Sequence, residues 1–200
     1  SGAGWVRHRL TLTHAEPAVR EEACEFVESL VTVAARHGAP VIVGSMQGRH
    51  EGSVSRADAL DHLASGLSRL SRHAAGLGQT LLYEPLNRYE TNLLNRNADA
   101  VAFLTQRGLK NVKLLCDLYH MNIEEQNLAE SLRQTGALVG HVHFADSNRR
   151  AIGFGHTDIA PIAAALKDIG YAGYLSAEII PLPDAATAAA QTMQSFRRVV

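Results

Sequence analysis

With 200 residues, 46% of them hydrophobic, and a formal net charge of −1, the chain is long enough to bury one sizeable core, and we expect one domain over residues 1–200. The balanced, interspersed charge argues against a nucleic-acid partner, since phosphate binding needs a basic stripe. No apolar run is long enough to span a membrane. Cys24 and Cys116 lack C-x-x-C spacing, which argues against a thiolate zinc site or disulfide framework and favours the cytoplasm.

The first ambiguous segment is Trp5–Thr13, which fits either a partial strand or a long loop. Five short apolar runs follow it, rich in β-branched or aromatic residues. Runs of this kind are typical of parallel strands buried on both faces. The predicted strands are Pro40–Ser45, Thr80–Glu84, Val112–Asp117, Leu138–Phe144 and Gly173–Glu178.

Helical patterns with apolar residues three to four positions apart lie between these strands. The first runs from Ala23 to Ala34 and is closed by Gly38, and the second starts at a capping-box pattern, Ser55-x-x-Asp58. Strand alternating with helix predicts a parallel α/β fold. The remaining predicted helices are Ala98–Arg107, Ile123–Thr135, Ile159–Ile169 and Asp184–Arg198.

Both an open doubly wound sheet and a closed barrel satisfy this alternation. The glycine-rich phosphate loop of the open sheet is missing, because Gly44-x-x-x-Gly48 does not match it and Gly153-Phe-Gly155 does not follow a strand directly. Polar residues end several strands, which is typical of a TIM-type (β/α) barrel. That barrel has eight strands, so we expect the first two or three βα units to be missing. An incomplete barrel has exposed strand edges that are able to pair with a second copy of the chain, so a homo-oligomer is also compatible with the sequence.

Four polar residues end successive predicted strands. Because the carboxyl ends of parallel strands meet at one rim, their side chains are expected to converge. A single acid at a strand end more often caps the next helix, but four in successive units favour a metal or catalytic site. Three carboxylates and one imidazole suit Mn²⁺ first, with Mg²⁺ or Co²⁺ as alternatives. The four residues are Glu84, Asp117, His143 and Glu178.

The segments around these residues resemble the D-tagatose 3-epimerase family of ketose 3-epimerases. This family lies within the xylose isomerase-like barrel superfamily, which also holds hydroxypyruvate isomerase. The resemblance runs from about residue 40 to the C-terminus, with four motifs in the family's order and at its approximate spacing. They are Tyr83–Glu90 (YEPLNRYE), Asp117–Glu125 (DLYHMNIEE), Gly140–Arg150 (GHVHFADSNRR) and Ser176–Glu178 (SAE).

The resemblance implies a role for each matching residue. Glu84, Asp117, His143 and Glu178 match the metal ligands, and Glu84 and Glu178 also match the acid/base pair. Residues that contact the sugar are matched by Glu90, His120 and Arg149. The implied activity is metal-dependent epimerisation of a small sugar at C3.

Other activities stay open from the sequence alone. An aldose-ketose isomerase of the hydroxypyruvate isomerase type uses similar groups, and a degenerate barrel without catalysis is also compatible. An endonuclease on this barrel needs more histidine ligands and a basic DNA-facing surface, which this sequence lacks.

Three further features have simpler interpretations. His141 faces the same side as His143 but farther from the rim, and we interpret it as a packed core histidine. Cys116 is interpreted as a small buried hydrophobe. Gly153–His156 is interpreted as a flexible lid or turn.

Overall fold

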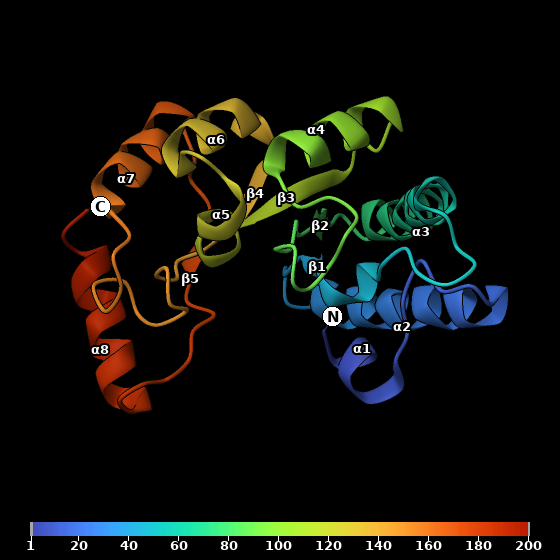
Figure 1. The fold of residues 1–200 in the computed structure, drawn as a ribbon, viewed down its shortest axis with the longest axis horizontal. Coiled ribbons are helices and arrows are strands. Elements are labelled where there is room, and N and C mark those ends of the chain that lie inside the picture. The colour runs from blue at the N-terminus through green and yellow to red at the C-terminus, as the bar shows by residue number, and fades with distance from the viewer. Residues whose placement is uncertain (1, 200) are drawn as a thin grey trace.

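The computed structural model describes residues 2–199 and contains one parallel sheet with the strands in sequence order (Figure 1). All neighbouring strands are paired in parallel. The five predicted strands are therefore confirmed, although four of them are shorter than predicted. They are β1 (Val41–Val43), β2 (Leu81–Tyr83), β3 (Val112–Asp117), β4 (Val139–His143) and β5 (Leu175–Ser176).

Helices form an arc around the outside of this sheet (Figure 1). Among residues 2–199, none of them is both long and apolar enough to cross a bilayer. The α-helices are α1 (Gly2–His8), α2 (Pro17–Ala35), α3 (Arg56–Gly76), α4 (Asn97–Gln106), α5 (Leu118–Glu124), α6 (Leu128–Thr135), α7 (Ile159–Asp168) and α8 (Ala185–Phe196), and the short 3-10 helices are η1 (Ser45–Gln47) and η2 (Gly136–Leu138).

The core lies between the sheet and this arc of helices. Strands β2 and β3 carry fully buried residues such as Leu81 and Leu114, and α3 contributes Leu63, Leu67 and Leu70. These leucines follow helical spacing, so one stripe of α3 packs against the sheet. The predicted cap is present, because the Ser55 hydroxyl accepts a hydrogen bond from the backbone N–H of Asp58 at 3.1 Å.

Two sequence predictions were wrong in detail. The segment Trp5–Thr13 was predicted as a partial strand or a long loop, but its first residues belong to helix α1, which ends at His8 and packs on η1. The predicted helix Ile123–Thr135 is two helices, α5 and α6. Glu125 has an extended backbone, and the Asn127 side chain caps α6 by accepting from the Glu130 N–H at 3.0 Å.

The sheet is an open arc of five strands, whereas a closed barrel of this type has eight. Strands β1 and β5 are the two edges of the arc, and Leu12 donates one backbone hydrogen bond to Met46 next to the β1 edge, at 2.8 Å. The predicted incomplete (β/α) barrel is thus the observed architecture. Its C-terminal rim brings together the polar residues at the ends of the strands.

Candidate metal centre

Four side chains meet at the C-terminal rim of the sheet, and we call them the quartet. One follows β2 directly, two are the last residues of β3 and β4, and one lies two residues beyond β5. Each offers a ligand atom, and these atoms all lie within 4.8 Å of one another. The structure therefore brings together the residues that the strand-end pattern selected. The quartet is Glu84, Asp117, His143 and Glu178.

His143 is the centre of the contacts within the quartet. Its Nδ1 atom lies 3.1 Å from Asp117 Oδ2, 3.0 Å from Glu178 Oε2 and 3.8 Å from Glu84 Oε1. Glu84 and Asp117 are buried, whereas the Glu178 side chain is 55% exposed. One imidazole nitrogen therefore faces all three carboxylates.

Burial and neighbouring groups shift the pKa values of Glu84, His143 and Glu178. Burial, together with the nearby charge of Asp117, raises the pKa of Glu84 to about 8. Burial acts to lower the pKa of His143, but hydrogen bonds to Asp117 and Glu178 outweigh it and raise this pKa to about 9. The hydrogen bond to His143 lowers the pKa of Glu178. Three close carboxylates thus need positive charge beside them, which a divalent cation would provide.

The residues fit a divalent metal by a second observation. Glu84 Oε1 is buried and has no hydrogen-bond partner among the described residues. An unsatisfied buried carboxylate oxygen is costly, and coordination to a cation would satisfy it. Gly44 leaves the space that this side chain uses, because a Cβ atom at position 44 would collide with Glu84 Oε2. An oxygen-rich set with one imidazole suits Mn²⁺, Mg²⁺ or Co²⁺.

His120, expected at the sugar, borders the quartet from α5. It is 1% exposed, and its Nε2 atom lies 3.8 Å from Glu84 Oε1. Its Nδ1 atom lies 2.7 Å from the side-chain nitrogen of Asn87, which also donates to Glu90 Oε1 at 3.2 Å. Burial lowers the pKa of His120, which favours the neutral ring. Asn87 therefore links the two predicted sugar contacts, His120 and Glu90.

Arg149 reaches the quartet from the loop after β4. One guanidinium nitrogen lies 3.1 Å from Glu178 Oε2, another lies 3.4 Å from His120 Nε2, and the group stacks over the Tyr119 ring at 4.7 Å. Its backbone has a positive φ of 58°, which is uncommon for a residue with a side chain. A cation with free donors thus stands beside the exposed member of the quartet.

Asp146 organises this loop, and sequence reasoning missed it. The side chain is fully buried, and its Oδ2 atom accepts backbone N–H groups of Gly153 at 2.7 Å and Gly155 at 2.9 Å. Its Oδ1 atom accepts from Ser147 at 2.7 Å and Thr157 at 3.0 Å. Burial opposes ionisation, but these backbone hydrogen bonds lower its pKa to about 2.

The segment interpreted as a flexible lid or turn, Gly153–His156, is thus a turn tied to Asp146. Gly155 must be glycine, because a Cβ atom there would collide with Asp146 Oδ1. The signal for this turn in the sequence was Asp146, which stands shortly after a predicted strand and is followed within nine residues by Gly153 and Gly155.

Two more residues that sequence reasoning missed fix the position of Glu84. The Gln47 side chain donates to the backbone oxygens of Glu84 at 3.0 Å and Gly44 at 3.1 Å. Its amide oxygen accepts from the Tyr83 hydroxyl at 2.5 Å. Tyr83 is fully buried, so this support lies inside the core.

The interpretations of Cys116 and His141 have different outcomes. Cys116 is fully buried, as predicted for a small hydrophobe. His141 is only partly buried and contacts a polar group, because its Nε2 atom lies 2.7 Å from the Ser176 hydroxyl. The interpretation of His141 as a packed core histidine was therefore wrong, because its side chain lies on a partly open part of the inner sheet surface.

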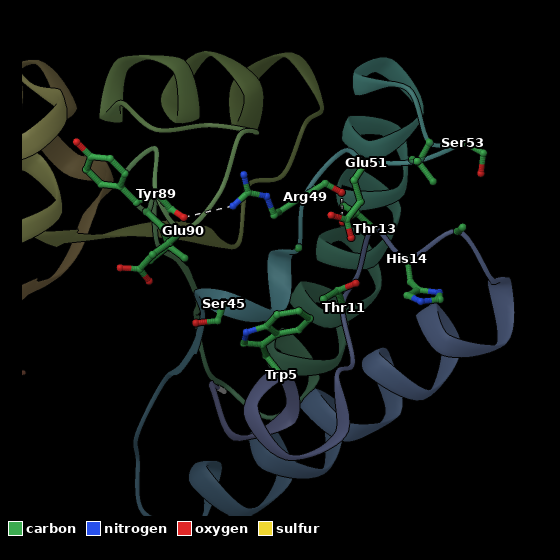
Figure 2. A pocket seen from close by; sticks show the side chains of 15 residues that line it. Trp5, Thr11, Thr13, His14, Ser45, Arg49, Glu51, Ser53, Tyr89 and Glu90 are labelled. Carbon is green, nitrogen blue, oxygen red and sulfur yellow. Dashed lines mark hydrogen bonds between the residues drawn. The ribbon is translucent and has the colours of Figure 1, made fainter.

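A cavity of about 830 Å³ is lined by residues of α1 and of the segments that follow β1 and β2 (Figure 2). Its wall includes Leu86, Tyr89 and Glu90 from the loop after β2, and Ser45 and Arg49 from the segment after β1. Since Glu90 Oε1 lies 3.8 Å from His120 Nδ1, the cavity borders the residues around the quartet.

The chain is similar to sugar-isomerising enzymes. Residues 2–199 match the family described as Xylose isomerase-like TIM barrel. The chain is 34% identical over 170 residues to an L-ribulose 3-epimerase from Methylomonas sp. (strain DH-1), covering 84% of this chain and 59% of that protein. It is 40% identical over 113 residues to a 3-dehydro-D-guloside 4-epimerase from Escherichia coli (strain K12), covering 56% and 43%.

A solved structure gives the same fold. A crystal structure of D-allulose 3-epimerase from Methylomonas sp. superposes with a TM-score of 0.87 at 28% sequence identity, over 96% of this chain and 74% of that one. The chain spans less than two thirds of the length of the curated relatives named above.

Proposed function

Since this chain belongs to the xylose isomerase-like TIM-barrel family, we propose that it epimerises ketose sugars at C3 by proton transfer. One observation carries the proposal. The carboxylates of Glu84 and Glu178 follow strands that are far apart in the sequence, yet both belong to the quartet, whose potential metal-ligand atoms all lie within 4.8 Å of one another. Its 3-epimerase relatives support the reaction type.

We propose that the quartet holds one divalent ion, Mn²⁺ in first place and Mg²⁺ or Co²⁺ as alternatives. The support is the ligand chemistry of three carboxylates and one imidazole, together with the unsatisfied oxygen of Glu84. A bound divalent cation supplies Lewis-acid polarisation of a carbonyl oxygen.

Glu84 and Glu178 are the proposed acid/base pair. Epimerisation removes the proton from C3 on one face of the sugar and returns a proton on the other, so it needs a group on each side. Glu84 is held rigidly in the buried wall of the site, whereas Glu178 enters from the exposed side. In this assignment Glu178 exchanges the C3 proton and Glu84 works opposite it.

Arg149, His120 and Glu90 are proposed to orient the sugar. The guanidinium of Arg149 offers donors beside Glu178, and the neutral ring of His120 lies between Arg149 and Glu84. The Glu90 carboxylate is 44% exposed and borders the cavity, so a sugar hydroxyl can donate to it. These contacts would fix which carbon faces the two carboxylates.

A second candidate is 4-epimerisation of a keto-glycoside. The 40% identity to the 3-dehydro-D-guloside 4-epimerase favours it, because the proton adjacent to a carbonyl is again the one that moves. An aldose-ketose isomerase would move the proton between C1 and C2 with similar groups.

We also propose a cytoplasmic enzyme with a small sugar substrate, no nucleic-acid partner and association into a homo-oligomer. The two buried, unpaired cysteines support the compartment, the 3-epimerase relatives support the small sugar substrate, and the balanced charge supports the lack of a nucleic-acid partner. The unpaired outer edge of β5, within the described part of the chain, supports the last. Light scattering after size exclusion measures the oligomeric state.

Deuterium exchange tests the reaction. The Mn²⁺-loaded protein is incubated with a panel of ketoses in deuterated water, and the label is located by NMR. Label at C3 is expected, label at C4 of a keto-glycoside selects the second candidate, and label at C1 or C2 selects the isomerase. Absence of label on every sugar with metal bound would favour a barrel without catalysis.

Glu178→Gln supplies the residue-level control of this experiment. It should keep the fold and lose most of the exchange, because the amide cannot accept the proton. Glu130→Gln, which changes an exposed acid on α6, should leave exchange unchanged. Equal exchange in both variants would contradict the assignment of Glu178.

A further inference from the structure

Glu90 connects the surroundings of the quartet with the cavity, because it contacts His120 and also lines the cavity. Glu84 Oε1 lies 3.8 Å from His120, and His120 lies 3.8 Å from Glu90, which lines the cavity. From Glu90 the lining of the cavity continues across to His14 and Ser53 (Figure 2). The cavity is therefore separated from the quartet by His120 and Glu90, and a group carried by a molecule at the quartet would pass Glu90 to enter it.

The lining of the cavity combines an aromatic surface with charged and hydroxyl groups. The Trp5 side chain projects from α1 beside Ser45 and Thr11, and the Arg49 side chain crosses above them toward Tyr89 (Figure 2). The Arg9 guanidinium lies over the Trp5 ring at 4.8 Å, but Trp5 is still 37% exposed, so part of its ring remains available to a ligand. An aromatic ring offers a large contact surface at low entropic cost, and it suits the C–H face of a sugar ring.

Several polar groups of this cavity have donors or acceptors to spare. Within the described residues, the side chains of Ser45 and Glu51 have no hydrogen-bond partner. Arg49 donates one hydrogen bond, to the backbone oxygen of Tyr89 at 3.3 Å. Guanidinium, carboxylate and hydroxyl groups together recognise a ligand that carries many hydroxyls. This chemistry differs from that of a purely apolar pocket.

The size of the cavity is sufficient for a sugar ring. Its volume of about 830 Å³ lies in the upper part of the range of roughly 300–1,000 Å³ that is common for small-molecule sites. None of His120, Arg149 and the four residues of the quartet lines the cavity. The cavity is therefore additional space.

We propose that this cavity is a second sugar-binding subsite, and that the substrate is a two-ring sugar in which a ketose carries a glycosyl group. The ketose lies at the quartet, and the second ring stacks on Trp5 while its hydroxyls contact Ser45 and Arg49. This inference rests on the proposed function for the position of the ketose. It concerns residues that take no part in the proton transfer.

A binding experiment tests the subsite without turnover. Trp5 is the single tryptophan of the sequence, so its fluorescence reports on the cavity directly. The Mn²⁺-loaded chain is titrated with maltulose or isomaltulose, which are glucosyl-fructoses, and with D-fructose. The two disaccharides are expected to change the Trp5 emission and to bind about tenfold more tightly than D-fructose. Equal affinities with an unchanged emission would overturn the proposal.

Two variants assign the effect to the cavity. Trp5→Ala, measured by calorimetry, and Arg49→Met, measured by fluorescence, should each weaken disaccharide binding about fivefold and leave D-fructose binding unchanged. Arg72→Met, which changes an exposed arginine of α3, is the matched control and should bind like the parent chain. An effect of the cavity variants on both sugars alike would contradict a second subsite.

Turnover separates this proposal from the proposed function. If the disaccharides bind through Trp5 and no sugar exchanges deuterium, the subsite stands and the proposed reaction fails. If D-fructose and both disaccharides exchange with equal kcat/KM and Trp5→Ala changes neither, the reaction stands and the subsite fails.

Discussion

The two ends of the sheet differ sharply in how they are packed. In the part formed by β1 to β4, one face of strands such as β2 and β3 belongs to the hydrophobic core, and Leu81 and Leu114 are fully buried. Strand β5 lies at the other end (Figure 1). It has two residues, and Tyr174 beside it is 84% exposed. Met193 on α8 is 48% exposed. The first part carries most of the core, whereas the second is an open margin.

The candidate site is divided along the same line. Glu84, Asp117 and His143 come from the packed part and are buried, while Glu178 comes from the open margin and is half exposed. The core surrounds the three buried side chains, and Gln47 holds the backbone of Glu84 by a hydrogen bond. An exposed carboxylate can meet a substrate and exchange protons with water. Under the proposed function, packing thus separates the residues that hold the site from Glu178, which faces the sugar.

The largest expected effect contrasts core leucines of the two ends. Leu114→Ala should reduce the free energy of unfolding by about 3–5 kcal/mol, because it leaves a cavity in a site that cannot collapse. Leu175→Ala on β5 should cost less than about 1 kcal/mol, since that side chain is only partly buried. Urea denaturation of both variants measures the difference. Similar losses would mean that the open margin is packed as well as the rest.

The next effect concerns metal affinity. Asp117→Asn should weaken Mn²⁺ binding by about 100-fold or more, because a fully buried ligand loses its charge while its helix cap to Tyr119 is kept. Glu178→Gln should weaken it by only about tenfold, since water can replace an exposed ligand. Isothermal calorimetry gives both constants. A larger loss for Glu178→Gln would reverse the comparison.

A smaller effect is expected at Asp146. Asp146→Asn replaces one acceptor oxygen with a donor facing the Gly153 and Gly155 N–H groups, which should cost about 1–3 kcal/mol at pH 7. The folded pKa of about 2 lies below the ordinary value near 3.9. This stabilisation is therefore present above about pH 4 and is lost as the pH falls through 2.

Unfolding free energies of parent and Asp146→Asn, measured from pH 7 to pH 2, test this prediction. The difference between the two proteins should shrink as the pH falls. Asp158→Asn is the matched control, because asparagine caps α7 as well as aspartate does. A constant difference across this range would show that the charge of Asp146 is not what holds the loop.

The smallest expected effect tests a local feature of the packed part. Ser55→Ala removes the cap of α3 and should lower the free energy of unfolding by about 1 kcal/mol. Ser53→Ala changes an exposed loop serine nearby and should be neutral. Thermal unfolding of the two variants is sufficient to compare them. Equal melting temperatures would mean that the Ser55 cap contributes nothing.

The sequence by itself determined the order and type of the strands and the residues at their ends. Short apolar runs closed by Glu84, Asp117 and His143 predicted both the parallel sheet and the rim where these side chains meet. Such predictions succeed because hydrophobic periodicity and strand direction are local properties of the chain. The cap at Ser55 and the burial of Cys116 are local in the same way.

Only the tertiary structure decided the features that depend on distant partners. The helix at Gly2–His8 forms where it packs on η1, which no local pattern of Trp5–Thr13 could indicate. Asp146 and Gln47 act through backbone groups brought to them by folding, so their importance has no periodic signature. The same holds for the cavity beside Glu90, because its walls come from α1 and from the segments after β1 and β2, which meet only in the folded chain.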